Sequence, residues 1–140
     1  MAMKYFKLYE LVDRRTFETE GEEAWLHFDT NALIALDDLR SFFGLPITVN
    51  TWHSGGAFQY RGYRPQDCTV GVKGSYHRKG MAFDLDVSTY RAEEVRKIII
   101  ENKNNPLLSK ITRIEAGVTW IHFDIAPLLA SQGRIYEFHA

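Results

Sequence analysis

Two short segments of strict alternation constrain the fold of this chain more than any other feature. In residues 82–87, apolar side chains alternate with Asp84 and Asp86. Residues 120–125 alternate in the same way, with His122 on the polar side. Because a strand points successive side chains to opposite faces, each segment predicts a strand with one buried and one polar face. If the two strands share a sheet, one face will carry Asp84, Asp86, Trp120, His122 and Asp124.

A helical pattern covers residues 31–43, where apolar side chains recur three and four positions apart. Thr30 can cap the beginning of this helix, and Gly44 suits the position after its end. The alternating residues 47–52 that follow predict a further strand.

A second helix is expected to begin at Ser88 or Thr89 and to end near residue 102. Beyond it, residues 111–115 and 120–125 flank a short segment with a glycine, which predicts a β-hairpin. The last ligand candidate, His122, would then lie in the second strand of this hairpin.

The remaining segments are expected to be less regular. Residues 1–29 predict an arm with short turns, and residues 53–74 predict a long loop of the kind that often carries function. Residues 126–132 are expected to form a short helix, and residues 135–138 a last strand or tail. The resulting order α, β, β, α, β, β predicts an α+β fold, with an antiparallel sheet flanked by helices.

Size and composition narrow the range of functions. The 140 residues fit a single domain, 1–140, with a hydrophobic core. The formal net charge is −1 and there is no basic stripe, so nucleic acid is not expected as a partner. Cys68 is the only cysteine, which excludes an internal disulfide and a cysteine zinc site.

No apolar run approaches the roughly 20 residues that span a bilayer, so we expect no membrane partner. The first residues lack the apolar core of a signal peptide, and we therefore expect the chain to be cytoplasmic as synthesised. The sequence does not indicate an oligomeric state.

Two histidines and one aspartate are candidate metal ligands. His77 lies just before the strand that carries Asp84, and Gly80 between them allows a sharp bend. His122 comes from the second alternating segment. Two imidazoles and one carboxylate can hold Zn²⁺ and leave a coordination position for water, which is the arrangement of a catalytic zinc site. The sequence therefore predicts a zinc-dependent hydrolase.

Residues 75–84 read SYHRKGMAFD, which resembles the S-x-H-x-x-G-x-A-x-D signature of the zinc D-Ala-D-Ala peptidases. This family includes VanX-type dipeptidases, D-alanyl-D-alanine carboxypeptidases and phage L-alanyl-D-glutamate endolysins, and the hedgehog amino-terminal domain is a distant relative. Residues 120–122 are similar to the W-x-H element of the family. The resemblance implies a hedgehog-like fold. It also implies that the zinc ligands are His77, Asp84 and His122.

The resemblance also implies a carboxylate that acts as general base, often three residues before the last histidine. Thr119 occupies that position here and cannot take a proton from water at neutral pH. Glu115, at the end of the preceding predicted strand, is the nearest upstream acid and our candidate base. Asp86 and Asp124 are the alternatives, because they lie on the same predicted polar faces.

Family members carry an arginine before the signature, often in an S-G-Y-R string, that binds the substrate carboxylate or polarises the scissile carbonyl. Arg64 fits the G-Y-R pattern best, and Arg61 is the alternative. A guanidinium suits either task because it is planar, charged and able to bond two oxygens. We expect substrate contacts from Ser75, Tyr63, Tyr76 and Trp120, with Tyr60 also near the cleft.

These expectations describe a zinc metallopeptidase that cleaves peptidoglycan stem peptides or cross-links, as a carboxypeptidase or an endolysin. A chain made without a signal would reach the cell wall after lysis or by virion delivery. The alternative is a non-catalytic zinc-binding module, such as a phage virion or tail component, because Thr119 replaces the usual acid. A third reading is an unrelated α+β binding domain with an accidental signature.

Overall fold

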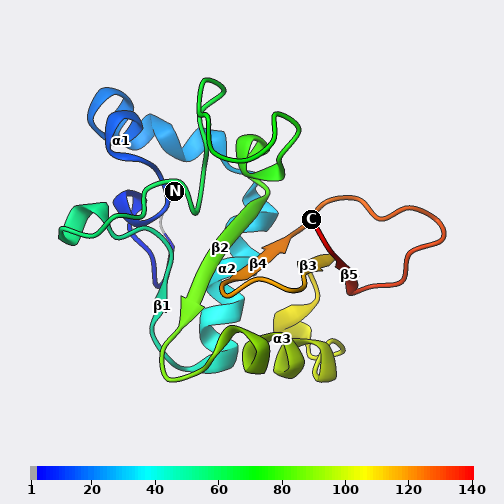
Figure 1. Ribbon diagram of the computed structural model, residues 1–140. Helices are drawn as coiled ribbons and strands as arrows, with labels where there is room; N and C mark the ends of the chain where they lie inside the picture. The colour runs from blue at the N-terminus through cyan, green and yellow to red at the C-terminus, as the bar shows by residue number, and fades with distance from the viewer. Residues whose placement is uncertain (1–2) are drawn as a thin grey trace.

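The computed structural model describes residues 3–140 and is built around one five-stranded sheet in the order β1-β2-β4-β3-β5. Figure 1 shows β2 crossing the middle of the molecule, with β4 beside it. The strands are β1 (Ile47–Thr48), β2 (Ala82–Val87), β3 (Arg113–Glu115), β4 (Ile121–Asp124) and β5 (Tyr136–Phe138). The α-helices are α1 (Arg14–Glu20), α2 (Thr30–Phe43) and α3 (Ala92–Glu101).

The sheet is mixed, which corrects the prediction of an antiparallel sheet. β1, β2, β4 and β3 pair antiparallel with their neighbours, but β5 lies parallel to β3. The direction of β5 follows from the connection before it. Residues 125–135 leave β4 in a wide irregular loop and return on the far side of β3 (Figure 1). The chain reverses direction once after β4, so β5 runs opposite to β4. Because β3 also runs opposite to β4, β5 lies parallel to β3.

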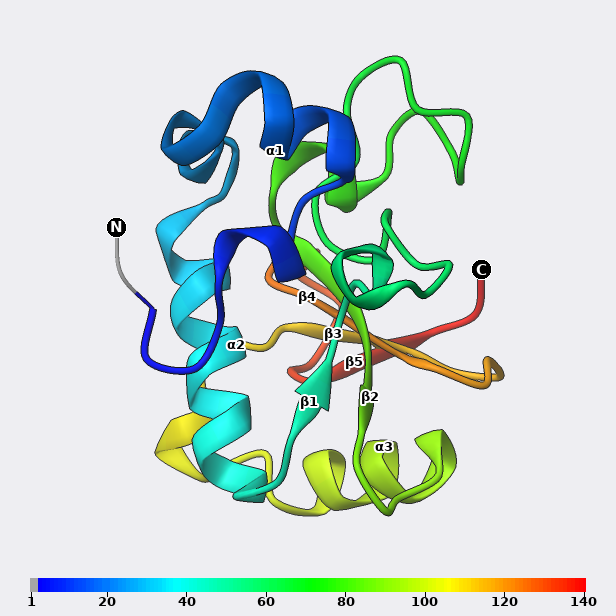
Figure 2. The same cartoon turned by 90° about the vertical axis from the view of Figure 1, so that its left-hand side faces the viewer.

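The two faces of the sheet differ. α2 packs along one face, and α3 crosses one end of the strands (Figure 2). The opposite face carries long loops instead of a helix, and the predicted long loop 53–74 lies there with only the 3₁₀ turn Trp52–Ser54 at its beginning. Polar side chains of β2 and β4 can therefore face a cavity rather than a packed layer. No helix within residues 3–140 has the length and apolar character needed to cross a membrane.

Helix α2 confirms the predicted helix over residues 31–43. Its N-cap is Asp29 rather than Thr30, because the Asp29 carboxylate accepts a hydrogen bond from the amide of Asn31 at 2.8 Å. Gly44 ends the helix in the left-handed conformation, with φ of 64°. The buried stripe of the helix is Ala32, Leu33, Ala35, Leu36 and Leu39.

Within the predicted arm, residues 1–29, the described residues 3–29 are more regular than expected. They include α1, which begins after Asp13, and the buried Asp13 carboxylate accepts hydrogen bonds from both the amide and the hydroxyl of Thr16. Leu11 and Val12 lie in the hydrophobic core without exposed surface. Phe17 is the one large apolar residue of α1, so the sequence shows no helical pattern of apolar residues there.

Other predicted boundaries shift because local turns replace regular structure. α3 begins at Ala92 rather than at Ser88 or Thr89, since Thr89 has a φ of 71° and turns the chain before the helix. β1 ends at Thr48 rather than at residue 52. The predicted helix over 126–132 is absent from this described part of the chain, which is an irregular loop.

A one-turn 3₁₀ helix, Tyr76–Lys79, brings His77 to the beginning of β2. Gly80 ends this turn with φ of 66°, in the left-handed region that glycine tolerates best. A Cβ atom at Gly80 would lie 2.0 Å from the carbonyl oxygen of His27. The backbone carbonyl of Gly80 also accepts a hydrogen bond from the amide of Asp29 at 3.0 Å. The turn that carries His77 is therefore fixed against the segment that leads into α2.

We expect Gly80→Ala to lower the free energy of unfolding by about 2 kcal/mol or more, because it adds a backbone clash to an unfavourable φ. Gly44→Ala is the matched control: its φ of 64° is similar, and no atom lies within 4 Å of the added Cβ. Urea denaturation of both variants separates the two effects. Equal losses for the two variants would contradict the close packing of Gly80.

Candidate metal centre

Asp84 on β2 and His122 on β4 lie directly opposite each other in the antiparallel pair. The amide of Asp84 donates to the carbonyl of Arg61 at 2.7 Å and so points away from β4. In an antiparallel ladder, partners whose amides point away from each other form the closely spaced kind of pair, with Cα atoms about 4.5 Å apart. The pairing of β2 with β4 therefore brings the two side chains together on one face, as the sequence predicted.

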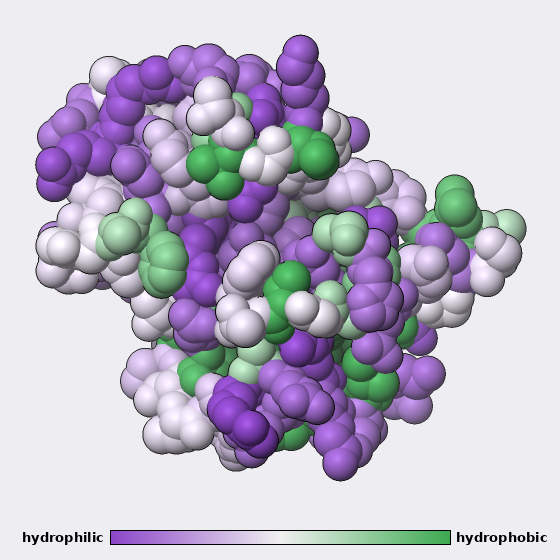
Figure 3. All heavy atoms as spheres, viewed as in Figure 1, coloured by the Kyte–Doolittle hydropathy of each residue, from purple (hydrophilic) through white to green (hydrophobic). Residues whose placement is uncertain are grey.

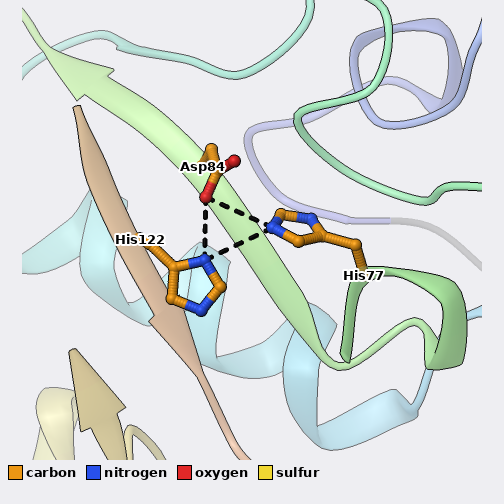
Figure 4. A group of neighbouring side chains, drawn as sticks. All are labelled: His77, Asp84 and His122. Carbon is orange, nitrogen blue, oxygen red and sulfur yellow. Dashed lines mark hydrogen bonds and ion pairs between the residues drawn. The ribbon is translucent and has the colours of Figure 1, made fainter. Parts of the chain in front are cut away.

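His77 reaches the same point from its 3₁₀ turn (Figure 4). Its Nε2 atom lies 3.2 Å from Oδ1 of Asp84 and 3.3 Å from Nδ1 of His122. His122 Nδ1 and Asp84 Oδ1 are 2.8 Å apart. We call His77, Asp84 and His122 the cluster. All three are buried, and the structure confirms that they form a group able to hold a metal ion.

The spacing of these atoms suits a small tetrahedral ion. Metal–ligand bonds of about 2.0–2.1 Å place ligand atoms roughly 3.3 Å apart in a tetrahedral site. The three distances in the cluster, 2.8, 3.2 and 3.3 Å, are close to this value. The side chains would therefore need only small shifts to surround an ion.

Both imidazoles are held by their outer nitrogen atoms. His77 Nδ1 lies 2.9 Å from the carbonyl oxygen of Gly62, which can only accept, so this nitrogen carries the proton and Nε2 faces the cluster. His122 Nε2 lies 3.0 Å from Oδ2 of Asp124. Hydrogen bonds of this kind orient histidine ligands and raise their basicity at metal sites.

Two arginines fix the two acids from the outside. Arg64 donates from Nη2 to Oδ2 of Asp84 at 3.2 Å, which leaves Oδ1 facing the histidines. Arg113 binds both oxygens of Asp124, at 2.9 and 3.0 Å. The guanidinium of Arg113 also lies 4.1 Å from the ring centre of Phe138, on the last strand. The cluster is thus surrounded by charged partners that hold it without an ion.

These contacts set the charges of the cluster. Burial opposes ionisation of Asp84, but the hydrogen bond from His122 and the contact with His77 outweigh it and hold the pKa of Asp84 well below its ordinary value. Burial alone would lower the pKa of His122, yet its bonds to Asp124 and Asp84 raise that pKa to about 9. Burial lowers the pKa of His77. At neutral pH the metal-free cluster therefore pairs one carboxylate with one charged and one neutral imidazole.

A cavity of about 440 Å³ opens over the cluster, and we call it the cluster cavity. Glu115, the predicted base, lines this cavity from the end of β3. Thr119 does not; it lines a neighbouring cavity of about 420 Å³. We call this second space the arginine cavity, and its walls include Phe58, Tyr60, Arg61, Arg64, Asp86 and Trp120.

Three of the predicted substrate contacts line the cluster cavity: Ser75, Tyr76 and Trp120. Ser75 also accepts a hydrogen bond from the amide of His77 and so caps the turn that carries this ligand. Tyr63 differs from expectation. Its side chain is only 6% exposed, stacks on His27 with ring centres 4.2 Å apart, and lines neither cavity. Tyr63 therefore packs the long loop against the core instead of facing a substrate.

The two arginine candidates occupy different places. Arg64 lies beside the cluster, where it bonds Asp84 and lines both cavities. Arg61 lines only the arginine cavity, and it donates a hydrogen bond to Oδ2 of Asp86 at 2.9 Å. Of the two alternative bases, Asp86 is therefore paired with Arg61 and lines the arginine cavity, not the cluster cavity. Asp124 is fully buried and bonded to His122 and Arg113.

Sequence reasoning missed Arg113 and Phe138. The one available signal was the hairpin, in which Arg113 faces Asp124 across β3 and β4. That pairing depends on the exact register of the hairpin, which the residues between the strands do not specify. A scan of protein-family models, a search of curated proteins and a search of solved structures found no match to this chain.

We expect the chain to bind one divalent ion, and replacing any member of the cluster with alanine to weaken Zn²⁺ binding at least about 100-fold. Isothermal titration with zinc chloride measures this. Asp86→Ala is the matched control, since Asp86 lies on the same strand two residues after Asp84 but outside the cluster. Equal weakening by Asp84→Ala and Asp86→Ala would argue against the site.

Metal affinity should rise with pH, about tenfold per pH unit, and level off near pH 9. The reason is that His122 has its pKa raised to about 9, and Nδ1 must lose its proton before an ion can bind there. Below this pKa, protons compete with the metal. Titrations across the range test this, and Asp124→Asn should move the break to lower pH by removing one carboxylate. A flat affinity between about pH 6 and pH 9 would show that His122 is already neutral.

Proposed function

We propose that this chain is a zinc metallopeptidase that hydrolyses peptide bonds of peptidoglycan. The observation that carries the proposal is the convergence of His77, Asp84 and His122 beneath a cavity that Glu115 also lines. Metal-dependent hydrolysis requires ligands that hold the ion on one side. On the other side it requires a general base and open space for the substrate. The signature in residues 75–84 adds the resemblance to zinc D-Ala-D-Ala peptidases.

Zinc is the metal we propose because two imidazoles and one carboxylate are typical of catalytic zinc sites. When bound, zinc polarises the scissile carbonyl and lowers the pKa of a coordinated water to ~7. The outer hydrogen bonds to Gly62 and Asp124 support this assignment, because they orient His77 Nε2 and His122 Nδ1 toward the position of an ion.

Glu115 is the residue we propose as general base. It would take a proton from the attacking water and return it to the leaving amine. The alternatives are less suited to this role. Asp124 has no exposed surface and is bonded to His122 and Arg113, while Asp86 forms an ion pair with Arg61 in the neighbouring cavity.

Arg64 is the residue we propose to stabilise the negative charge that develops on the carbonyl oxygen. Its guanidinium is held by the carbonyl of Tyr60 at 2.8 Å and by Asp84 at 3.2 Å. A positive group fixed before the reaction needs no reorganisation during it, which makes such stabilisation effective. Tyr76 and Trp120, which line the cluster cavity, would contact the peptide on either side.

Peptidoglycan stem peptides are the proposed substrate because the resemblance is to enzymes of that class. The protein would act on the cell wall after release or delivery. The second candidate is a non-catalytic metal-binding module, such as a virion component. It is favoured by one observation: Thr119, at the family's usual acid position, lines the arginine cavity instead of the cluster cavity. The peptidase would need Glu115 for hydrolysis, whereas the non-catalytic module would not.

We expect Glu115→Gln to lower kcat for hydrolysis of purified muropeptides by roughly 10²–10⁴-fold and to leave Zn²⁺ affinity unchanged. Mass spectrometry of digests measures the first effect and calorimetry the second. Glu137→Gln is the control, because Glu137 lies on neighbouring β5 and lines neither cavity. Stoichiometric zinc without any hydrolysis by the wild type would favour the non-catalytic module.

A further inference from the structure

Acidic side chains gather in one segment of an otherwise balanced chain. Seven of the 18 acids lie within residues 16–39, which contain no lysine or arginine, although the net charge of the whole chain is only −1. Four of the seven are glutamates in residues 18–23, and all four are exposed. Of these four, only Glu20 contacts a basic side chain within the described residues 3–140, and that partner is His27, at 2.6 Å. In Figure 3, hydrophilic side chains dominate the surface over α1.

A pocket of about 430 Å³ opens in the same segment, between the 3₁₀ helix Gly21–His27 and the beginning of α2. We call it the acidic pocket, and it is lined by Glu22, Glu23, Trp25, Leu26, Phe28, Thr30 and Leu33. Its apolar floor belongs to the core, because Phe28 also stacks on Phe83 with ring centres 5.8 Å apart. The acidic pocket shares no lining residue with the cluster cavity or the arginine cavity.

Leu26 lines the acidic pocket and is nevertheless 86% exposed, more than any other large hydrophobic side chain of residues 3–140. The neighbouring Trp25 is only 9% exposed, and its indole donates a hydrogen bond to Glu22 at 2.8 Å. A small molecule that fills the pocket would leave the projecting Leu26 in water. The surface of another macromolecule can fill the pocket and cover Leu26 together, so the shape favours a macromolecular partner.

The charge around the acidic pocket selects the kind of partner. Glutamates beside the pocket repel the anionic surface of a lipid membrane and the phosphates of nucleic acid. They attract lysine and arginine side chains, and complementary charge of this kind speeds association and fixes the register of an interface. Two copies of the chain joined through this surface would bring like charges together. The charges therefore favour a basic segment of another protein.

We propose that the acidic pocket is a docking site for a basic segment of a partner protein. A large apolar side chain of that segment fills the pocket beside Trp25 and Leu33, and Leu26 packs into the partner. Lysine or arginine side chains of the segment pair with Glu23. The inference does not rest on the proposed function, because docking here needs neither a metal ion nor hydrolysis.

The test uses three labelled peptides with helical spacing: one of leucine and lysine, one with glutamate for every lysine, and one with glutamine for every leucine. Fluorescence anisotropy measures their binding to the full chain. We expect the leucine–lysine peptide to bind at least about tenfold more tightly than either of the others, and its affinity to fall as salt is added. Equal affinity for the glutamate peptide or for the glutamine peptide overturns the inference.

Two pairs of variants locate the binding. Leu26→Ser should weaken binding of the leucine–lysine peptide roughly tenfold, whereas Leu129→Ser, at another leucine with 67% of its surface exposed, should not. Glu23→Gln should weaken it roughly threefold, whereas Glu137→Gln, at an exposed glutamate outside the pocket, should not. All four positions are exposed, so misfolding does not explain a difference. Equal effects within either pair overturn the assignment to the acidic pocket.

Two further measurements address other occupants of the acidic pocket. Analytical ultracentrifugation of the wild type and of Leu26→Ser over a range of concentrations tests a second copy of the chain. Co-sedimentation with phosphatidylcholine vesicles tests a lipid surface. We expect the same association state for both proteins and no binding to vesicles. Self-association or vesicle binding that Leu26→Ser abolishes gives the pocket another occupant and overturns the inference.

Discussion

The pairing of β2 with β4 is the interaction on which the candidate site depends. It sets Asp84 opposite His122 in a closely spaced pair, on the face of the sheet that no helix covers. Because side chains alternate along a strand, a slip of one residue would turn one of these groups into the core. The buried residues Phe83 and Phe123, which are also directly opposite, oppose such a slip. The apolar face thus secures the register, and the register brings the ligands together.

Around that pair the chain builds a network in which each charged group has a partner. Asp84 lies between two imidazoles and Arg64, and Asp124 lies between His122 and Arg113. Buried charges are tolerated when they are paired and hydrogen-bonded, and a network of this kind holds side chains in one arrangement. The three side chains of the cluster are therefore held in place by the protein itself, and an ion bound among them would require little reorganisation. The same pairing engages both carboxylate oxygens of Asp124 and orients the candidate ligand His122.

The parts of the structure that follow from local patterns could be predicted, and those that depend on distant contacts could not. Helix α2 and strand β2 carry their periodicity and end signals in their own residues, so both were found with nearly correct bounds. The three candidate ligands followed from residue type and strand faces. The parallel pairing of β5 depends on where an irregular loop returns, and the core position of Tyr63 depends on His27, far away in sequence. The pairing of Arg113 with Asp124 requires the register of a hairpin, which alternation alone leaves open.

The last strand has a consequence for how the cluster is shielded from water. Phe138 packs with its ring edge-on to His122, at 5.6 Å between centres, and beneath the guanidinium of Arg113. This ring closes one side of the cluster from the edge strand of the sheet, which pairs with β3. Fraying of β5 would therefore open the cluster to water from this side, while Asp84 and His122 stay paired through the central strands.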